Sequence, residues 1–147
     1  MPKDQYSYKS EMRVRFGETD LQGVVFNANY LLYVDTAQMD YLRTIGVPYF
    51  DMLERGYDIV IVDASLQFLA PARFDEVLEV YARIYEIGNS SIRMDYEIHE
   101  AESERFVARA QTAYVIIDKE SQKPVRVPPY IRRAVREFES REDIEEV

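Results

Sequence analysis

The sequence is poor in the residues that build most reactive centres: it has no cysteine, no tryptophan and one histidine in 147 residues. Without cysteine the chain can form no disulfide, no thiolate nucleophile and no zinc site of the cysteine type. One histidine cannot supply the two or three imidazoles of a histidine metal site within one subunit. Catalysis must therefore rest mainly on carboxylates, hydroxyls, amides, arginine and lysine, or backbone dipoles.

Long hydrophobic segments are also missing. Uninterrupted apolar runs, such as residues 30–34 and 59–62, are at most five residues long, far short of the roughly 20 residues that a membrane-spanning helix needs. The N-terminus lacks the apolar region of a secretory signal. We therefore expect a cytoplasmic protein without membrane partners.

Positive charge is scarce as well, since 18 basic and 27 acidic side chains give a formal net charge of −9. The field of such a chain repels nucleic acids and anionic membranes. The basic residues that cluster near the C-terminus alternate with acidic ones, so we expect a solvated helix face there rather than a nucleic-acid site; they are Arg126, Arg132, Arg133 and Arg136. No glycine-rich phosphate loop is present, which leaves nucleotide chemistry without a motif.

Hydrophobic periodicity predicts a strand followed by a long helix. Apolar residues occupy every second position from Met12 to Phe16, a pattern typical of a half-buried strand. From residue 28 to residue 45 they recur every three or four positions, which predicts a deeply buried helix about 27 Å long. Asn27 or Asn29 is the expected N-cap of this helix.

The remainder of the chain predicts a short helix over residues 49–54 and four more strands, over residues 57–68, 78–85, 92–98 and 106–117. A second long helix begins at Pro128-Pro129 and runs to about residue 138, and we expect the acidic tail, residues 139–147, to fray. This order predicts a single α+β domain over residues 1–147, with a five-stranded antiparallel sheet wrapped around the first long helix. Because one helix covers only one sheet face, we expect a homodimer, with further association to a tetramer.

The only histidine, His99, falls on the charged side of its predicted strand, beside Glu97. We expect it to be a solvated surface residue. This expectation disfavours a Ser-His-Asp hydrolase and any other mechanism that needs a histidine base.

The loop before the long helix contains residues that are better suited to catalysis. Glu18 and Asp20 lead directly into the helix start, which offers unpaired N–H donors and the positive end of the helix dipole. Such donors can stabilise an oxyanion while a carboxylate attacks a carbonyl or activates water. From spacing alone a structural role is favoured, in which Asp20 makes a turn and Asn27 caps the helix.

The loop continues as Glu18-Thr19-Asp20-Leu21-Gln22-Gly23-Val24-Val25-Phe26-Asn27-Ala28-Asn29-Tyr30. This segment resembles the signature of the 4-hydroxybenzoyl-CoA thioesterase-like hotdog family, approximately Asp-x-Asp-x-x-Gly-x-Val-x-x-x-x-Tyr after a first strand. The similarity extends to residues 33–37, 54–56 and 74–78, so it covers most of the chain. It implies the hotdog fold, in agreement with the predicted element order, and it implies an acyl-CoA thioesterase.

The resemblance also implies roles for individual residues. Asp20 would be the catalytic carboxylate, either as nucleophile or as general base for water, and the backbone N–H at Asn27 would polarise the carbonyl. The residues expected to bind the acyl-CoA substrate are Gly23, Val24, Phe26, Tyr30, Asp35, Val60 and Val62. For Asp35 a salt bridge is equally compatible with its helical phase. A thiol with a pKa of about 8.5 leaves easily, so we expect no catalytic triad, metal or cofactor.

Several features depart from the family pattern, among them Phe16, which stands where relatives often carry Tyr. Glu18 stands where Asp is more usual, and Asn27 replaces the His or Tyr of better-known relatives. The hairpin at residues 87–91 lacks the basic residues that often bind the phosphates of coenzyme A in this family. Three alternatives therefore stay open: an acyl-carrier-protein thioesterase, a non-catalytic acyl-CoA-binding module, and a dehydratase, which by resemblance would need a histidine in its site.

Overall fold

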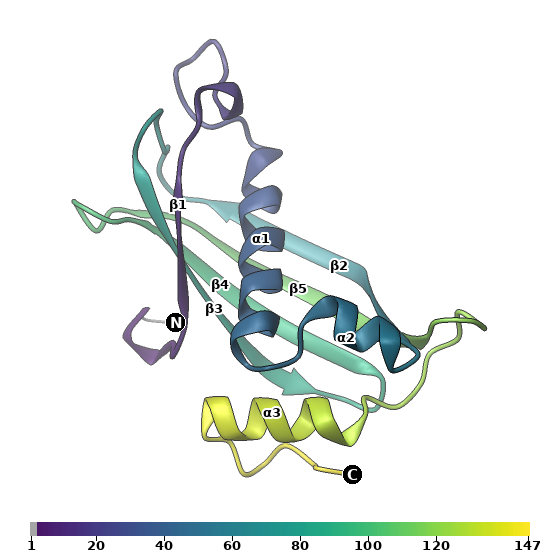
Figure 1. Cartoon of the computed structure of the whole chain (residues 1–147). Helices are drawn as coiled ribbons and strands as arrows, with labels where there is room; N and C mark the ends of the chain where they lie inside the picture. Colours follow the sequence, from purple (N-terminus) through teal and green to yellow (C-terminus); the bar gives the residue numbers. More distant parts are fainter. Residues whose placement is uncertain (1–2) are drawn as a thin grey trace.

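The computed structural model describes residues 3–147, in which a five-stranded antiparallel sheet curves around one long helix (Figure 1). The sheet order is β1-β3-β4-β5-β2. The strands are β1 Lys9–Arg13, β2 Tyr57–Phe68, β3 Val77–Ile87, β4 Ser91–Glu100 and β5 Phe106–Asp118, and the helices are α1 Asn29–Thr44, α2 Tyr49–Glu54 and α3 Pro129–Glu139, with short 3-10 turns at Lys3–Gln5 and Phe16–Glu18. The predicted α+β class, five-stranded antiparallel sheet and C-terminal helix are confirmed.

Helix α1 forms the core by packing its apolar stripe against the inner face of the sheet. The stripe consists of Tyr30, Val34, Ala37 and Tyr41, all buried. Alternate residues of the middle strands face it and are equally buried, among them Leu78, Val80, Ala82 and Ile84 of β3 and Ile92, Met94, Tyr96 and Ile98 of β4. Full burial of each large aliphatic side chain contributes about 1.5–3 kcal/mol. No helix in the described part of the chain is long and apolar enough to cross a membrane.

The two edges of the sheet differ in length and polarity. β1 has five residues and alternates a buried Ser10 with charged neighbours. β2 has 12 residues, and its side chains Val60, Ile61 and Val62 are exposed. The register between β2 and β5 shifts between Ile61 and Asp63, which makes Val62 the extra residue of a β-bulge. A long apolar edge strand is normally covered by another element or another chain.

The first strand lies three residues earlier in the chain than predicted. β1 ends at Arg13, and the chain then turns away from the sheet into the Phe16–Glu18 turn. The ring of Phe16 is 77 % exposed and meets the ring of Phe74 edge-on, with centroids 5.9 Å apart. The prediction that Phe16 lies on the buried side of the strand is wrong, because hydrogen bonds between Arg15 and Glu18 redirect the chain.

A buried guanidinium fastens α3 to the rest of the protein. Arg132 is 1 % exposed, so the prediction of a solvated arginine face is wrong at this position. Its nitrogens donate only to main-chain carbonyls, those of Val127 (2.8 Å), Gly88 (2.6 Å), Asn89 (3.1 Å) and Glu145 (3.2 Å). Arg136 donates to the carbonyl of Ile144 at 2.8 Å, and the Ile144 side chain is buried. Instead of the expected fraying, the acidic tail turns back along α3.

Candidate active site

The loop between β1 and α1 is built around the carboxylate of Glu18, which is 7 % exposed. Its Oε1 accepts hydrogen bonds from the Arg15 backbone N–H (2.9 Å) and the Tyr33 hydroxyl (2.8 Å), and its Oε2 accepts one from Arg15 Nε (2.7 Å). The Glu18 carbonyl accepts from the Phe26 N–H and from Asn29 Nδ2, both at 2.9 Å. Burial raises the pKa of Glu18, but the hydrogen bonds from Arg15 and Tyr33 outweigh it and lower that pKa. Glu18 therefore joins both ends of the loop as a carboxylate.

Asp20 lies in the turn that follows. Its Oδ1 accepts a hydrogen bond from the Gln22 N–H at 2.8 Å, while its own N–H donates to the Val24 carbonyl and its carbonyl accepts from the Gly23 N–H, both at 2.9 Å. Gly23 has a φ of +79°, a backbone conformation that glycine adopts without strain. The second carboxylate oxygen of Asp20, Oδ2, accepts no hydrogen bond from any described residue. That oxygen is open to a substrate or a water molecule.

The start of α1 leaves backbone donors unused. The N-cap residue is Ala28 and no side chain caps it, so the prediction that Asn27 or Asn29 caps the helix is wrong. The side-chain amide of Asn29 instead donates a hydrogen bond to the Glu18 carbonyl. Within residues 3–147, no acceptor binds the N–H of Asn27 or Ala28. Two open donors at the positive end of a helix dipole can stabilise an oxygen that becomes negative during a reaction.

Asn27 borders a hollow of about 260 Å³ beside the helix start, and Asp20 and Ala28 are not part of its lining. Its lining consists of Val24, Val25, Asn27, Tyr30, Phe68, Leu69, Ala70 and Pro71. The Tyr30 hydroxyl accepts a hydrogen bond from the Ala72 N–H at 3.3 Å, and the Tyr30 ring packs on Phe68 with centroids 5.5 Å apart. Burial raises the pKa of Tyr30, so the hydroxyl stays protonated. The hollow brings together three residues predicted from the sequence, Val24, Asn27 and Tyr30.

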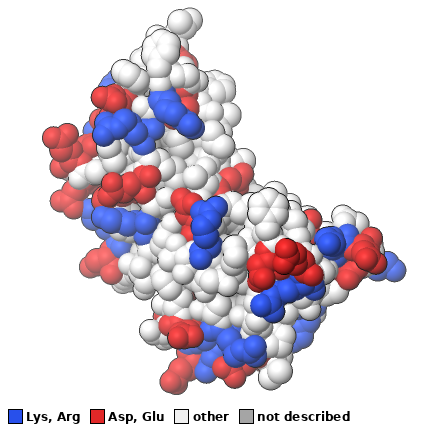
Figure 2. All heavy atoms as spheres, viewed as in Figure 1, with Lys and Arg blue, Asp and Glu red and all other residues white. Residues whose placement is uncertain are grey.

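Exposed apolar side chains surround this region. Phe26, one of the residues predicted to bind substrate, is among them, together with Phe16, Leu21 and Phe74. Figure 2 shows uncharged atoms at the extreme tip of the β1–α1 loop, with acidic and basic side chains next to one another below it. Clustered exposed apolar surface of this kind is typical of a contact with a ligand or another protein.

Asp35 lies on α1, six residues beyond Asn29. Its side chain makes no ion pair with any described residue, so the alternative salt-bridge role has no partner in this part of the chain. Partial burial raises the pKa of Asp35. Its charge acts on two buried hydroxyl groups of the sheet, those of Tyr96 and Tyr114. Asp35 therefore lies on the side of α1 that faces β5.

Strand β2 presents its two predicted binding residues in different ways. Val60 pairs with Val115, whereas Ile61 pairs with Tyr114, which belongs to the buried core. Paired residues of neighbouring antiparallel strands project to the same face. Ile61 therefore shares the inner face with α1, and Val60 projects from the opposite face, so it does not line a hollow against α1. Val62 lies at the bulge and is exposed.

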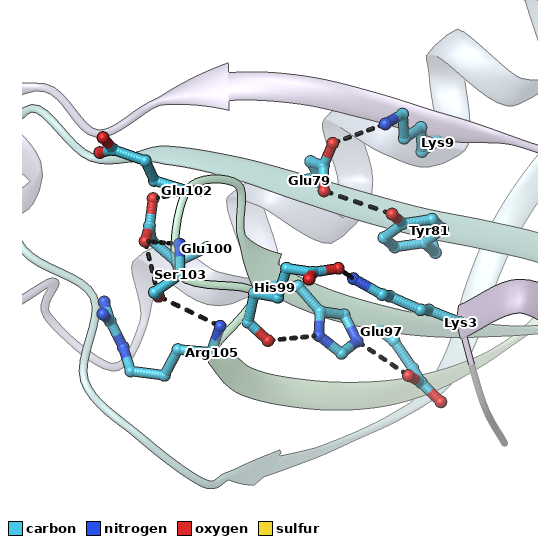
Figure 3. Close-up of polar contacts among 11 residues, drawn as sticks. Lys3, Lys9, Glu79, Tyr81, Glu97, His99, Glu100, Glu102, Ser103 and Arg105 are labelled. Atoms are coloured by element: carbon cyan, nitrogen blue, oxygen red, sulfur yellow. Dashed lines mark hydrogen bonds and ion pairs between the residues drawn. The ribbon is translucent and has the colours of Figure 1, made fainter.

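The histidine belongs to a separate polar cluster on the outer face of the sheet (Figure 3). His99 is 6 % exposed, so the prediction of a solvated surface histidine is wrong. Its Nε2 is hydrogen-bonded to Glu97 Oε1 at 2.9 Å, and its ring stacks on Phe106 with centroids 4.5 Å apart. The neighbouring Ile98 points into the core, so His99 points away from α1. His99 therefore does not face the hollow beside Asn27.

A larger hollow, of about 670 Å³, has an unsuitable charge for a phosphate-bearing ligand. It is lined by Glu11, Arg13, Phe74, Asp75, Glu76, Val77, Glu100, Ala101 and Glu102. Five carboxylates against one guanidinium repel anions. Among the described residues, no group of three or more His, Asp or Glu side chains is arranged to hold a metal ion.

Comparison with known proteins establishes the family. The model of the thioesterase-like superfamily matches residues 14–135. The chain belongs to this superfamily. It is a thioester hydrolase with the hotdog fold, as the resemblance of the Glu18–Tyr30 segment implied.

Relatives of this thioesterase include a putative acyl-CoA thioesterase of Bacillus subtilis, 29% identical over 118 residues that cover 80% of this chain and 85% of the relative. The chloroplastic acyl-acyl carrier protein thioesterase ATL3 of Arabidopsis thaliana is 29% identical over 136 residues, with coverage of 92% and 71%. Among solved structures, a 1,4-dihydroxy-2-naphthoyl-CoA thioesterase from Synechocystis matches with a TM-score of 0.81 and 29% identity, over 87% of this chain and 94% of that chain.

The sequence analysis missed several residues of the site: Tyr33, and in the lining of the hollow Val25, Phe68, Leu69, Ala70 and Pro71. Phe68 lines the hollow from the end of β2, and its place could have been found from the apolar residues that alternate at the end of that strand, Leu66 and Phe68. Tyr33 binds the Glu18 carboxylate from α1. No spacing in the sequence indicated that contact, because it joins a helix to a loop whose path is set by the fold.

Proposed function

We propose that this thioesterase hydrolyses acyl-CoA at the hollow beside the start of α1, with Asp20 as the catalytic carboxylate. The observation that carries the proposal is a carboxylate with one open oxygen in the same short loop as two backbone donors that have no acceptor. The 2.9 Å hydrogen bond from the Asp20 N–H to the Val24 carbonyl ties this residue to the wall of the hollow. Gly23 permits the turn, and Tyr30 and Phe26 supply aromatic surface for the substrate.

Thioester hydrolysis needs few protein groups beyond Asp20 and the backbone donors. As a general base, Asp20 takes a proton from water while the water oxygen attacks the thioester carbonyl carbon. As a nucleophile, a carboxylate oxygen attacks that carbon and forms a mixed anhydride, which water then hydrolyses. In both cases the C–S bond breaks, one water is consumed, and the products are the carboxylic acid and the thiol. A thiol with a pKa of about 8.5 leaves without a strong general acid. The Asn27 N–H stabilises the carbonyl oxygen as it gains negative charge.

A second copy of the chain completes the site in this proposal. The free edge of β2 carries Val60, Ile61 and Val62, and Phe68 at its end is exposed as well. Pairing two β2 strands about a two-fold axis would satisfy both edges and bury these side chains. Asp35 and Val62 would then border the acyl group from the interface. Sedimentation equilibrium checks the dimer, and a monomeric mass at micromolar concentration would exclude it. A tetramer stays a prediction.

An acyl-carrier-protein thioester is the second candidate substrate. The Arabidopsis relative carries that activity in its name, and the hairpin at residues 87–91 of this chain offers no basic side chain to the phosphates of coenzyme A. Carrier proteins are typically acidic, however, and the net charge of −9 opposes their approach. To separate the two candidates, kcat/KM is measured for the same acyl group carried by coenzyme A and by a carrier protein.

Thiol release from a panel of short, long and aromatic acyl-CoA substrates tests the activity. We expect Asp20→Asn to lower kcat by at least about 100-fold, because it removes the carboxylate that takes the proton from water or attacks the carbonyl carbon. Asp4→Asn is the matched control, since Asp4 is an exposed acid of the N-terminal 3-10 turn, and we expect it to retain full activity. Full activity in Asp20→Asn would refute the site. Tight acyl-CoA binding by the unmodified protein without any turnover would favour the non-catalytic module.

A further inference from the structure

Arg73 is an exposed arginine whose backbone pairs with the loop between β1 and α1. Its guanidinium forms no hydrogen bond or ion pair with any described residue, since its bond to Glu76 comes from the backbone N–H. The carboxylates that follow it in the chain are paired with other arginines. Asp75 Oδ1 lies 3.4 Å from Arg13 Nη1, and Glu76 Oε1 lies 2.7 Å from Arg105 Nη2. The positive charge of Arg73 is therefore available to an anion.

The backbone under Arg73 is held firmly against the start of α1. Arg73 and Val24 face each other across an isolated antiparallel bridge, and the Val25 N–H donates to the Ala72 carbonyl at 2.8 Å. Because that hydrogen bond joins the residues on either side of the bridge, Val24 and Arg73 form a non-hydrogen-bonded pair, in which the side chains are closest. Paired side chains project to the same face. The Ala72 N–H is held in turn by the Tyr30 hydroxyl, at 3.3 Å.

Val24 connects Arg73 to the proposed reaction site. The Val24 carbonyl accepts the Asp20 N–H at 2.9 Å, and Val24 and Asn27 both line the hollow of about 260 Å³. Residues 68–71 also line it, and they lead directly into Ala72 and Arg73. A substrate that has its thioester at Asn27 and extends past Val24 therefore meets the side chain of Arg73.

Other arginines are less well placed for this contact. Arg109 and Arg133 are exposed, and neither makes a hydrogen bond or ion pair with a described residue. Arg109 lies over the Phe106 ring of β5, 5.3 Å from its centroid, and Arg133 belongs to α3. Neither β5 nor α3 contributes to the lining of the hollow. The hairpin at residues 87–91 has no basic side chain, so an anionic part of the substrate needs a cation elsewhere.

We propose that Arg73 binds the phosphate groups of coenzyme A and makes this enzyme prefer thioesters whose thiol carries phosphate. The inference rests on the proposed acyl-CoA hydrolysis and assigns a residue to the part of the substrate that does not react. A guanidinium matches two phosphate oxygens with its planar fork of donors. Since the phosphates take no part in the reaction, the contact is equally strong in the ground state and the transition state. It therefore lowers KM and leaves kcat unchanged.

Thioesters of one acyl group with different thiols test the proposal: acyl-CoA, acyl-4′-phosphopantetheine and acyl-pantetheine. We expect kcat/KM to be at least about tenfold higher for acyl-CoA than for acyl-pantetheine, as for one charge-assisted hydrogen bond. Arg73→Met should remove this preference by raising KM for acyl-CoA and not for acyl-pantetheine. Arg133→Met is the control, since it removes the same charge from an exposed site on α3, and it should keep the preference.

The intermediate substrate identifies the phosphate that is bound. A kcat/KM for acyl-4′-phosphopantetheine close to that of acyl-CoA supports a contact with the phosphate on the pantetheine arm. A value close to that of acyl-pantetheine supports a contact with the phosphates nearer the nucleotide. In both cases the proposal requires that the step in kcat/KM disappears in Arg73→Met.

Equal kcat/KM values for acyl-CoA and acyl-pantetheine in the unmodified protein would overturn the inference while leaving thioester hydrolysis intact. An equal loss for both substrates in Arg73→Met would also overturn it, because it would assign Arg73 to the loop or to the acyl group. Calorimetric binding of free coenzyme A and of pantetheine gives a readout without turnover. We expect coenzyme A to bind more tightly, and Arg73→Met to abolish the difference. If no acyl thioester is hydrolysed, the proposed function fails, and this binding difference still decides the role of Arg73.

Discussion

Two regions of the molecule differ in how far their polar groups are hydrogen-bonded: the start of α1, and the junction between α3 and the acidic tail. At the junction, Arg132 donates to four carbonyls, so a charged side chain and four backbone acceptors are all satisfied. At the start of α1, the N–H groups of Asn27 and Ala28 and one oxygen of Asp20 have no partner among the described residues. The first region uses its hydrogen-bonding capacity to hold the fold. The second keeps that capacity available for a substrate.

A fully hydrogen-bonded carboxylate and an open one lie two residues apart, at Glu18 and Asp20. The Glu18 carboxylate accepts three hydrogen bonds and the Glu18 carbonyl accepts two more. The saturated carboxylate fixes the loop, and the unsaturated one beside it is positioned as a result. The comparison therefore predicts that changes at saturated groups act mainly on stability, whereas changes at Asp20 act mainly on activity.

The largest effect on stability is expected at Arg132. Arg132→Met keeps the aliphatic stem but leaves the carbonyls of Gly88, Val127 and Glu145 without their donor, whereas the Asn89 carbonyl still accepts from the Val127 N–H at 2.7 Å. Leaving a buried acceptor unsatisfied costs about 1–3 kcal/mol, so losing the donor of three acceptors costs about 3 kcal/mol or more. We expect the free energy of unfolding to fall by about that amount in urea titrations. The distance of this junction from Asp20 along the chain and in the fold leaves kcat per folded molecule unchanged.

Arg133→Met is the matched control, because Arg133 is the exposed neighbour of Arg132 on α3. We expect it to change the free energy of unfolding by less than about 0.5 kcal/mol. Equal destabilisation in the two variants would contradict the comparison, since it would mean that the buried hydrogen bonds of Arg132 add nothing beyond ordinary surface effects.

A smaller loss of stability, joined to a loss of activity, is expected at Glu18. Glu18→Gln keeps the shape but weakens charge-assisted bonds to Arg15 and Tyr33, and hydrogen bonds to charged groups contribute about 1.5–3 kcal/mol. Because the Asp20 turn loses its anchor, we also expect kcat to fall by about tenfold or more, with little change in KM. Glu11→Gln on β1, where the carboxylate is exposed, is the control for both measurements.

The pH dependence of stability checks the cause. The pKa of Glu18 is lower in the folded protein than its ordinary value, because hydrogen bonds from Arg15 and Tyr33 outweigh burial. Its contribution is therefore complete above the unfolded pKa of about 4.3 and is lost as the pH falls through the folded pKa. The difference in stability between the unmodified protein and Glu18→Gln should be largest at neutral pH and shrink below about pH 4. A difference that stays constant down to pH 2 would show that packing, not charge, is responsible.

The sequence predicted those elements whose signal is local. The β2 bounds follow from a run rich in β-branched residues between Gly56 and Pro71, and the α1 stripe follows from its spacing of three and four. The alternation from Met12 to Phe16 was misleading because it continues past the point where Glu18 turns the chain away. For Val60, residues 59–62 are apolar on both faces, so no polar position marks the inner one.

The wrong predictions for His99 and Arg132 share one cause. Both residues sit among charged neighbours in sequence, which favoured a solvated position. The structure buries them through contacts with distant segments: Phe106 from the next strand stacks on His99, and the β3–β4 hairpin and the tail surround Arg132. The pattern of neighbouring residues in the sequence carries no information about such contacts between distant segments. For the site, the resemblance supplied Asp20 and Asn27, and the open donors and open oxygen that support them emerged only from the hydrogen bonds.

The smallest expected effect on the free energy of unfolding is at the junction between α3 and the tail, where the backbone of Ser140 is strained. Ser140 ends α3 in the left-handed conformation, with φ of 53° and ψ of 45°, which costs an L-residue energy that glycine does not spend. Ser140→Gly should therefore raise the free energy of unfolding by about 0.5 kcal/mol, less than the full strain because glycine also loses more chain entropy. Ser7→Gly is the control, since Ser7 is exposed and is not among the residues with positive φ, and it should be neutral or slightly destabilising. A gain in stability for Ser140→Gly without any change in kcat supports the separation between the two regions, and a change in kcat would show that the α3 junction and the start of α1 are coupled.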